Sequence, residues 1–185
     1  MLRICIIGKK LQKKLGLREA KYIISGAAPI APSLVNWFET IGITILQGYG
    51  MTEDTIVSHF NTPTDNRVGT VGKAVDNISI KLSSEGEICI KNQCLMKGYY
   101  KAPEITASVF DEEGFFKTGD IGEYDHEGFL TITGRVKDQF KTDKGKYISP
   151  APLELKMSLN TDIDQICLVG TGIPQPIVDH IVRTR

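Results

Sequence analysis

The sequence predicts an α/β segment followed by a β-rich segment, and three observations support this prediction. Residues 21–50 alternate short apolar stretches with glycine-containing loops around one helical pattern. Beyond about residue 67, apolar and polar residues alternate between turn sequences, which is typical of strands that bury one face. Near residue 137 the pattern changes once more. We therefore expect an α/β layer, then a small β structure, and then the start of a separate α+β unit.

The α/β segment is predicted from strand, loop and helix signals that follow one another closely. Lys21–Ser25 has the pattern of a short buried strand that ends in a loop of small residues. A helix should begin at Pro32, since proline suits a first helical turn, and should end at Gly42. Ile43–Leu46 forms the next strand and leads into a second glycine loop, Gly48–Gly50. Because ligands bind where loops leave such strands, both glycine loops are candidate binding sites.

The β-rich segment is predicted from two hairpins and one short helix. Ile78–Leu82 alternates apolar and polar side chains, and Glu87–Lys91 returns after a Ser-Ser-Glu-Gly turn. A second hairpin turns at Asp125–Gly128 and continues into Phe129–Thr133, while a short helix should begin near Pro103. Turns at such close spacing favour a small distorted β-barrel or a bent sheet.

The C-terminal segment has the pattern of a small α+β unit. Gln139–Thr142 and Lys146–Ile148 flank a polar turn, and a helix should then begin at Ser149 and end near Leu159. Gln165–Gly170 has the composition of a buried strand, and no strand is predicted beyond residue 176. We therefore place a boundary between residues 136 and 137.

Composition indicates an ordinary globular enzyme domain and excludes several other classes. Of the 185 residues, 41% are hydrophobic, and 22 basic residues balance 22 acidic ones, so no net charge attracts the chain to nucleic acid. The four cysteines form no CxxC pair, and the histidines are scattered, so zinc-ligand spacing is absent. Cysteines within apolar runs indicate buried thiols in a reducing compartment, and we expect a cytoplasmic location.

The N-terminal residues carry a basic amphipathic pattern. Lys9, Lys10, Lys13 and Lys14 are interspersed with leucines, and the nearby apolar stretch is too short for a signal peptide or a membrane span. A solvated helix face explains this pattern. Peripheral contact with a membrane surface is the alternative explanation.

Candidate binding residues lie in the two glycine loops and directly after the second. Glycine lets the backbone approach a nucleotide closely, and Tyr49 offers a flat face for a base. Thr52 and Glu53 place a hydroxyl and a carboxylate where phosphate and Mg²⁺ need them. Tyrosine–glycine turns are also common in proteins that bind no nucleotide.

A second pair of candidates lies in the β-rich segment. Asp120, in Thr118–Asp120, can accept hydrogen bonds from both ribose hydroxyls, or it can simply start an Asx-turn. Arg135 can reach phosphate or ribose oxygens, or can form a surface ion pair. Templates for a P-loop, a dinucleotide fingerprint and a hydrolase nucleophile elbow are all absent.

Taken in order and spacing, these motifs resemble the adenylate-forming (AMP-binding) enzyme superfamily. They are Gly26–Ile30 (GAAPI), Gly48–Glu53 (GYGMTE), Thr118–Asp120 (TGD) and Gly134–Arg135 (GR). The stretch Gly134–Glu154 is particularly similar to the long-chain acyl-CoA synthetases. The resemblance covers residues 11 to 176. It implies that residues 1–136 are the C-terminal part of the large AMP-binding domain and that 137–185 are the hinge and the start of the small C-terminal domain.

The resemblance implies a two-step ligase reaction with ATP, Mg²⁺ and coenzyme A. A fatty acid is adenylated, and the coenzyme A thiol then displaces AMP. It also implies a role for each candidate. The adenine pocket is lined by Gly26, Ala27, Ala28, Gly48, Tyr49 and Gly50. Thr52 contacts phosphate, Glu53 holds Mg²⁺, Asp120 binds the ribose and Arg135 contacts the nucleotide. Lys137 is the hinge, and Lys141 faces the nucleotide or coenzyme A.

The chain also departs from the family pattern. The Ser/Thr/Gly-rich phosphate loop of the family and its C-terminal catalytic lysine match nothing in this sequence. We therefore expect the chain to act with the missing remainder of an enzyme and to be inactive alone. Two alternatives remain: a fatty-acyl-AMP ligase that loads a carrier protein, and a truncated or split gene product.

Overall fold

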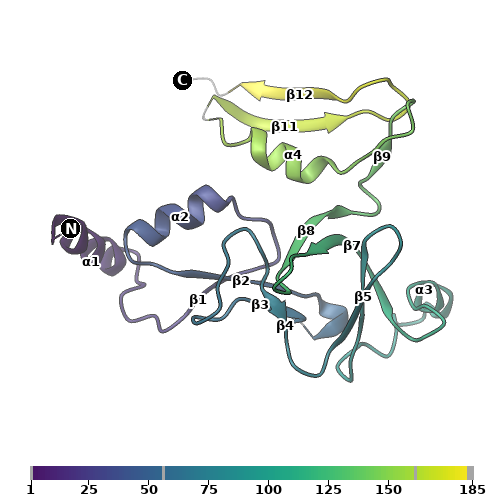
Figure 1. Ribbon diagram of the computed structural model, residues 1–185, viewed down its shortest axis with the longest axis horizontal. Helices are drawn as coiled ribbons and strands as arrows, with labels where there is room; N and C mark the ends of the chain where they lie inside the picture. The colour runs from purple at the N-terminus through teal and green to yellow at the C-terminus, as the bar shows by residue number, and fades with distance from the viewer. Residues whose placement is uncertain (1, 56, 161, 183–185) are drawn as a thin grey trace. The chain divides into compact units, whose positions relative to one another are not determined.

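The structure is a computed structural model that describes residues 2–55, 57–160 and 162–182; the side chains of residues 2–7 are not described. The chain forms two compact units. The first comprises Met1–Ser79, Lys91–Thr106 and Tyr124–Thr131, and the second comprises Ile80–Ile90, Ala107–Glu123 and Ile132–Arg185. Each unit is therefore assembled from segments that are distant in sequence. Figure 1 shows the elements along the chain.

The first unit is built on a mixed sheet with the order β1-β2-β3-β4. β1 and β2 are parallel, whereas β2–β3 and β3–β4 are antiparallel. The helices α1 and α2, the short 3-10 helix η1 and most of α3 belong to this unit. The bounds are α1 Leu2–Lys14, β1 Ile23–Ser25, α2 Pro32–Thr40, β2 Ile45–Tyr49, η1 Thr52–Asp54, β3 His59–Phe60, β4 Lys73–Ala74 and α3 Pro103–Ser108. β1 is not the buried strand that was expected, since Ile24 is 62% exposed.

A hydrophobic cluster joins α2 to this sheet. Val35 of α2 is fully buried, and it clusters with Ile43 and Ile45 and with the partly buried Ile23 and Phe38. The predicted helix is confirmed, and Gly42 follows it with a φ of 76°, a left-handed conformation that favours glycine. The second strand begins at Ile45 rather than Ile43, so that Gly48 and Tyr49, expected in a loop, form its last two residues.

The second unit contains most of an open four-stranded sheet with the order β5-β6-β7-β8. Its strands are β5 Ser79–Leu82, β6 Glu87–Lys91, β7 Phe116–Tyr124 and β8 Leu130–Arg135. Ile88, Cys89 and Ile90 of β6 are all buried, as is Phe116 of β7, so burial in β6 is continuous and does not alternate. Both predicted hairpins are confirmed. Among the described strands the sheet stays open at β5 and β8, so the small barrel that was expected is not closed.

The C-terminal part of the second unit consists of two short sheets and a helix. β9 (Phe140–Lys141) pairs with β10 (Tyr147–Ile148), and β11 (Ile163–Val169) pairs with β12 (Ile177–Val182). The helix α4 (Pro150–Met157) lies against the β11–β12 hairpin (Figure 1), where the Glu154 carboxylate accepts a hydrogen bond from the Leu168 amide at 2.7 Å. β12 was not predicted from the sequence.

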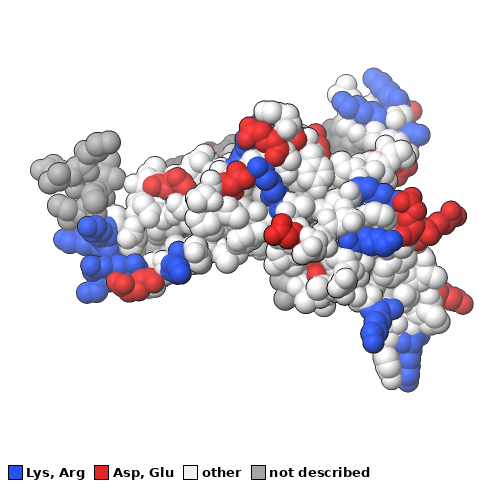
Figure 2. Space-filling model, turned by 60° about the horizontal axis from the view of Figure 1, so that its bottom comes forward, with Lys and Arg blue, Asp and Glu red and all other residues white. Residues whose placement is uncertain are grey.

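The structure also tests the expectations for the cysteines and for the basic N-terminal pattern. Cys89 is buried as expected, but Cys94 and Cys167 are exposed, and the Cys5 side chain lies outside the described part. Lys13 and Lys14 form the last turn of α1, and Figure 2 shows basic side chains gathered at that end of the chain. None of the described helices combines the length and the hydropathy that a membrane-spanning helix requires.

Candidate functional site

The two glycine loops leave the same edge of the first sheet. Gly26–Ala28 follow β1 directly, and Gly50 follows β2. Because β1 and β2 are parallel neighbours, with Ser25 opposite Gln47, their carboxyl ends meet at one edge (Figure 1). A Cβ atom built on Gly26 would lie 3.2 Å from the Gly48 carbonyl oxygen, so the two motifs touch. The structure therefore brings the adenine-pocket candidates together.

The backbone at this edge of the sheet lets other groups approach it closely. Ala27 has a φ of 68°, an unusual left-handed conformation for a residue with a side chain. Gly48 lies against Phe60 of β3, since a Cβ there would come within 2.7 Å of its ring. Gly26–Ala28 are solvent-exposed, and Tyr49 is half-buried beside them. An exposed loop with few side chains lets a planar base approach the backbone closely.

The turn after Tyr49 positions the predicted phosphate and metal residues. Thr52 and Glu53 are the first two residues of the 3-10 helix η1. The buried Asp54 fixes this turn, because its Oδ1 accepts a hydrogen bond from the Met51 amide at 2.9 Å. Asp54 is thus a structural acid, whereas Glu53 is only half-buried.

Tyr99 holds the Glu53 carboxylate, and the sequence analysis did not identify it. The Tyr99 hydroxyl donates to Glu53 Oε1 at 2.9 Å, and the Met96 amide donates to the Glu53 carbonyl at 2.7 Å. The Tyr99 amide in turn donates to Thr106 Oγ1 at 2.9 Å. Burial and this hydrogen bond raise the pKa of Tyr99, so the phenol keeps its proton and acts as a donor.

A single carboxylate fits a magnesium ion that arrives with a nucleotide. Within residues 2–55, 57–160 and 162–182, no group of three or more His, Cys, Asp or Glu side chains could hold a metal ion. Mg²⁺ is commonly bound by one or two carboxylates together with substrate phosphates and water. Glu53, with one oxygen held by Tyr99, is a residue that could supply such a carboxylate.

In the second unit, the TGD motif forms a bulge in β7. β6 residues Glu87 and Cys89 pair with Ile121 and Lys117, so β7 carries two extra residues between these pairs. Gly119 has a φ of 75°, which glycine adopts without strain, and its amide donates to Glu87 Oε1 at 2.9 Å. The sequence analysis did not predict this bulge, which gives the motif a fixed conformation.

Asp120 and Arg135, the predicted ribose and nucleotide contacts, form an ion pair. Arg135 Nε donates to Asp120 Oδ1 at 2.9 Å. The Asp120 side chain is 7% exposed, whereas that of Arg135 is 69% exposed. The buried carboxylate is therefore fixed, and the guanidinium retains donors that face solvent. The structure thus shows the surface ion pair that was one of the two alternatives for Arg135, and its partner is the motif aspartate.

The two lysine candidates lie beyond β8. Lys137 is exposed in the turn that follows this strand, while Val136 anchors the turn by donating its amide to the Gly119 carbonyl at 2.8 Å. Lys141 ends β9, and its Nζ lies 5.3 Å from the centre of the Tyr147 ring. Before them, Gly134 leaves room for Ser149, whose Oγ would lie 2.7 Å from a Cβ at that position.

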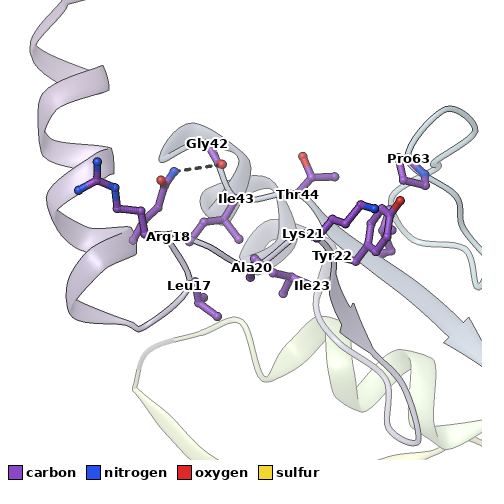
Figure 3. A pocket seen from close by; sticks show the side chains of 12 residues that line it. Leu17, Arg18, Ala20, Lys21, Tyr22, Ile23, Gly42, Ile43, Thr44 and Pro63 are labelled. Carbon is purple, nitrogen blue, oxygen red and sulfur yellow. Dashed lines mark hydrogen bonds between the residues drawn. The ribbon is translucent and has the colours of Figure 1, made fainter.

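A separate cavity of about 290 Å³ lies in the first unit (Figure 3). Leu17, Ile23 and Ile43 contribute apolar side chains, and Arg18 and Lys21 contribute positive charge. None of the predicted site residues lines it. Its volume is at the lower end of the range for small-molecule sites.

Comparison with known proteins identifies the class of protein to which the chain belongs. The chain belongs to the AMP-binding enzyme family, because the model described as "AMP-binding enzyme" matches residues 3–100, more than half of the chain.

Two of the similar proteins are named long-chain-fatty-acid–CoA ligases. Long-chain-fatty-acid–CoA ligase FadD15 of Mycobacterium tuberculosis is 36% identical over 172 residues, which cover 91% of this chain and 28% of that protein. Long-chain-fatty-acid–CoA ligase 5 of Rattus norvegicus is 34% identical over 189 residues, with 96% and 28% covered. The chain thus spans little more than a quarter of the length of these relatives.

Solved structures share the fold. The o-succinylbenzoate CoA synthetase MenE of Bacillus subtilis, in complex with the acyl-adenylate intermediate OSB-AMP, superposes with a TM-score of 0.83 at 23% identity, covering 98% of this chain and 40% of that chain. ATP-bound MatB of Rhodopseudomonas palustris gives a TM-score of 0.75 at 29% identity, with 85% and 33% covered. The α/β and β layers are therefore those of adenylate-forming enzymes.

Proposed function

We propose that this chain forms the adenine-, ribose- and metal-facing part of a long-chain-fatty-acid–CoA ligase. The observation that carries the proposal is the shared edge of two parallel neighbouring strands, where Gly26–Ala28 follow β1, Tyr49 ends β2 and Glu53 lies just beyond it. Identity of 34–36% to ligases named for long-chain fatty acids supports the substrate class. The proposed partners are a fatty acid, ATP, coenzyme A and the remainder of the enzyme.

The proposed reaction has two steps. The fatty acid carboxylate attacks the α-phosphate of ATP, which forms an acyl-adenylate and releases pyrophosphate. The coenzyme A thiol then attacks the acyl carbonyl, and AMP leaves. Mg²⁺, when bound, neutralises charge on the phosphate oxygens. Positioning and charge stabilisation dominate such chemistry, which agrees with a site that contains no nucleophilic side chain.

Within the first unit, three side chains have roles in this proposal. Tyr49 packs against the adenine, the Thr52 hydroxyl donates to a phosphate oxygen, and Glu53 supplies the carboxylate for Mg²⁺. Tyr99 holds one Glu53 oxygen at 2.9 Å, which leaves the other for the metal. The chain's contribution is thus to orient the nucleotide before the carboxylate attacks.

Within the second unit, the proposal assigns the ribose and the domain movement. Asp120 accepts hydrogen bonds from the ribose hydroxyls, and the exposed Arg135 guanidinium contacts the nucleotide. Lys137 serves as the hinge between residues 1–136 and 137–185, since an exposed turn at the end of a strand can absorb a dihedral change. Lys141 faces the nucleotide or coenzyme A.

The experiment is calorimetric titration of the purified chain with AMP. We expect binding, and we expect Tyr49→Ala to weaken it roughly tenfold or more, because stacking of a base on an aromatic ring contributes about 1–3 kcal/mol. The exposed Tyr22 provides a matched control, Tyr22→Ala, with wild-type affinity. Equal loss in both variants, or no binding by the wild type, would contradict the proposal.

A second measurement separates this proposal from its alternatives. Pyrophosphate exchange that depends on fatty acid should be absent from the chain alone and should return when the missing part of the enzyme is added. Thioester formation with free coenzyme A in the restored enzyme supports the CoA ligase. Transfer to a carrier protein only would favour a fatty-acyl-AMP ligase instead.

A further inference from the structure

His59 is a buried titratable residue for which the proposed reaction has no use. It lies in β3 with no exposed surface, and both ring nitrogens have partners. Nδ1 lies 3.1 Å from Ser58 Oγ, and Nε2 lies 2.6 Å from the Tyr124 hydroxyl. All three residues belong to the first unit. A buried polar group with two specific partners is a fixed element of the structure.

The direction of these hydrogen bonds follows from counting protons. Ser58 Oγ also lies 3.3 Å from the Tyr49 carbonyl oxygen, which can only accept. A hydroxyl has one hydrogen, so a Ser58 hydroxyl that donates to Tyr49 must accept from His59 Nδ1. A neutral imidazole then offers Nε2 as an acceptor to Tyr124. In this direction the Ser58 and Tyr124 hydroxyl hydrogens both have an acceptor within the group. In the reverse direction the Tyr124 hydrogen has none there, because Nε2 then carries a hydrogen itself, and the Ser58 hydroxyl gives up the Tyr49 carbonyl.

Burial favours the neutral His59 imidazole that this arrangement of hydrogen bonds requires. Desolvation lowers the pKa of His59 to about 4 and raises that of Tyr124 to about 12. At neutral pH the imidazole is uncharged, and the phenol keeps its hydrogen for donation.

The chain of hydrogen bonds ends on the residue proposed to contact adenine. Tyr49 and His59 are direct partners across the antiparallel β2–β3 pair, so their side chains share a face. Their ring centres are 6.0 Å apart with an angle of 51° between the planes. The Ser58 amide also donates to the Tyr49 carbonyl at 2.9 Å. Both the backbone and the ring of Tyr49 are thus held by this pair of residues.

We propose that Tyr124, His59 and Ser58 form a directed hydrogen-bond chain that locks His59 as the Nδ1–H tautomer and positions Tyr49 for the nucleotide. His59 is a positioning residue, since it acts through Tyr49. The part that concerns nucleotide rests on the proposed function; the tautomer and the orientation of the Tyr49 ring do not.

The test begins with ¹⁵N spectra of the three histidine rings at pH 7.5, with His59 assigned through the His59→Gln variant. We expect a protonated Nδ1 and an unprotonated Nε2. Tyr124→Phe removes only the donor hydroxyl, and it should shift the His59 ring nitrogens and the Tyr49 ring signals. The half-exposed Tyr22 gives the control Tyr22→Phe, which should leave both unchanged. An Nε2–H tautomer or a charged ring in the wild type would overturn the proposal.

AMP titration completes the test. Tyr124→Phe and Ser58→Ala should each weaken AMP binding roughly two- to tenfold, which corresponds to the loss of one hydrogen bond. Wild-type affinity in both variants, with folding intact, would overturn the positioning role. A wild-type chain that binds no AMP but shows the predicted tautomer and Tyr49 shifts would refute the proposed function and support the hydrogen-bond chain. Ser58→Ala keeps the test valid if Tyr124→Phe does not fold.

Discussion

The Tyr99 hydroxyl donates a hydrogen bond to Glu53 Oε1 at 2.9 Å, which joins residues 46 positions apart. The contact orders the carboxylate proposed to bind Mg²⁺ without adding a second charge. Because a ligand that is already oriented loses less entropy on binding, Tyr99 should increase the affinity for the metal–nucleotide complex.

The first prediction is that Tyr99→Phe selectively weakens binding of Mg·ATP. Loss of one hydrogen bond should lower this affinity roughly two- to tenfold, and Glu53→Gln should lower it further, because the charge itself is lost. Calorimetric titration of both variants with Mg·ATP, and with ATP plus a chelator, measures these losses of affinity. The effect should vanish when the chelator is present.

The matched control for this prediction is the neighbouring tyrosine. Tyr100 is 88% exposed, so Tyr100→Phe should bind Mg·ATP like the wild type. If Tyr99→Phe weakened ATP equally with and without Mg²⁺, Tyr99 would act on the fold of the loop and not on the metal ligand.

The second prediction concerns the ion pair between Asp120 and Arg135. If Asp120 binds the ribose, Asp120→Asn should weaken AMP binding roughly ten- to a hundredfold, since hydrogen bonds to charged groups contribute about 1.5–3 kcal/mol. The same variant should bind 2′,3′-dideoxy-AMP as the wild type does. Titration of the variant and the wild type with both ligands gives the loss of affinity for each ligand.

An acid of the same unit with a basic partner supplies the control. Asp111 pairs with Lys81 at 2.8 Å, and this pairing lowers the pKa of Asp111. Asp111→Asn should therefore leave AMP binding unchanged. A loss in Asp120→Asn that is the same for AMP and its dideoxy analogue would show that Asp120 only holds Arg135.

The third prediction is a pH dependence of stability that originates at His59. Its pKa is lowered from 6.5 to about 4 by burial, so between these values the unfolded chain binds a proton that the folded chain does not. The free energy of unfolding should fall as pH decreases from 6.5 towards 4, by up to about 1.4 kcal/mol per pH unit. Urea unfolding at several pH values measures the slope.

The slope should be assigned by comparing two variants. His59→Gln removes the buried base and should flatten the dependence in this window, whereas His126→Gln, at an 86% exposed side chain, should retain it. An unchanged slope in His59→Gln would mean that other groups set the pH dependence.

Much of the fold was predictable because its signals are local. Proline at the start of α2 and glycine after it, alternating side chains in β5 and the turn before β6 identify these elements without tertiary information. β12 was missed because all six of its residues are exposed, so it has no alternation of buried and exposed positions. β3 and β4 were missed because two-residue strands have no periodicity.

The candidate site was predictable only where one motif carried the residues. Tyr49, Thr52 and Glu53 lie within one short sequence and were found together. Tyr99 and Tyr124 were not, because their partners are brought to them by folding, across 46 and 65 positions of the chain. A tyrosine in a sequence does not reveal which acceptor its hydroxyl will meet.

The fourth prediction is that Gly72→Ala severely destabilises the first unit. Gly72 has a φ of 89°, and a Cβ there would lie 2.0 Å from the Phe60 carbonyl carbon. Such a contact with backbone cannot be relieved by turning a side chain. The loss should exceed the roughly 1–3 kcal/mol that a strained backbone conformation costs by itself, and urea unfolding should show a lower midpoint.

Gly128→Ala separates the two causes of this loss. Gly128 has a similar φ of 85°, but no atom lies within 4 Å of its would-be Cβ. It should therefore show the conformational cost alone, roughly 1–3 kcal/mol. The difference between the two variants measures the close approach of Gly72 to β3, the strand that carries His59. Equal losses would mean that this approach relaxes at little cost, and that the position of β3 does not depend on it.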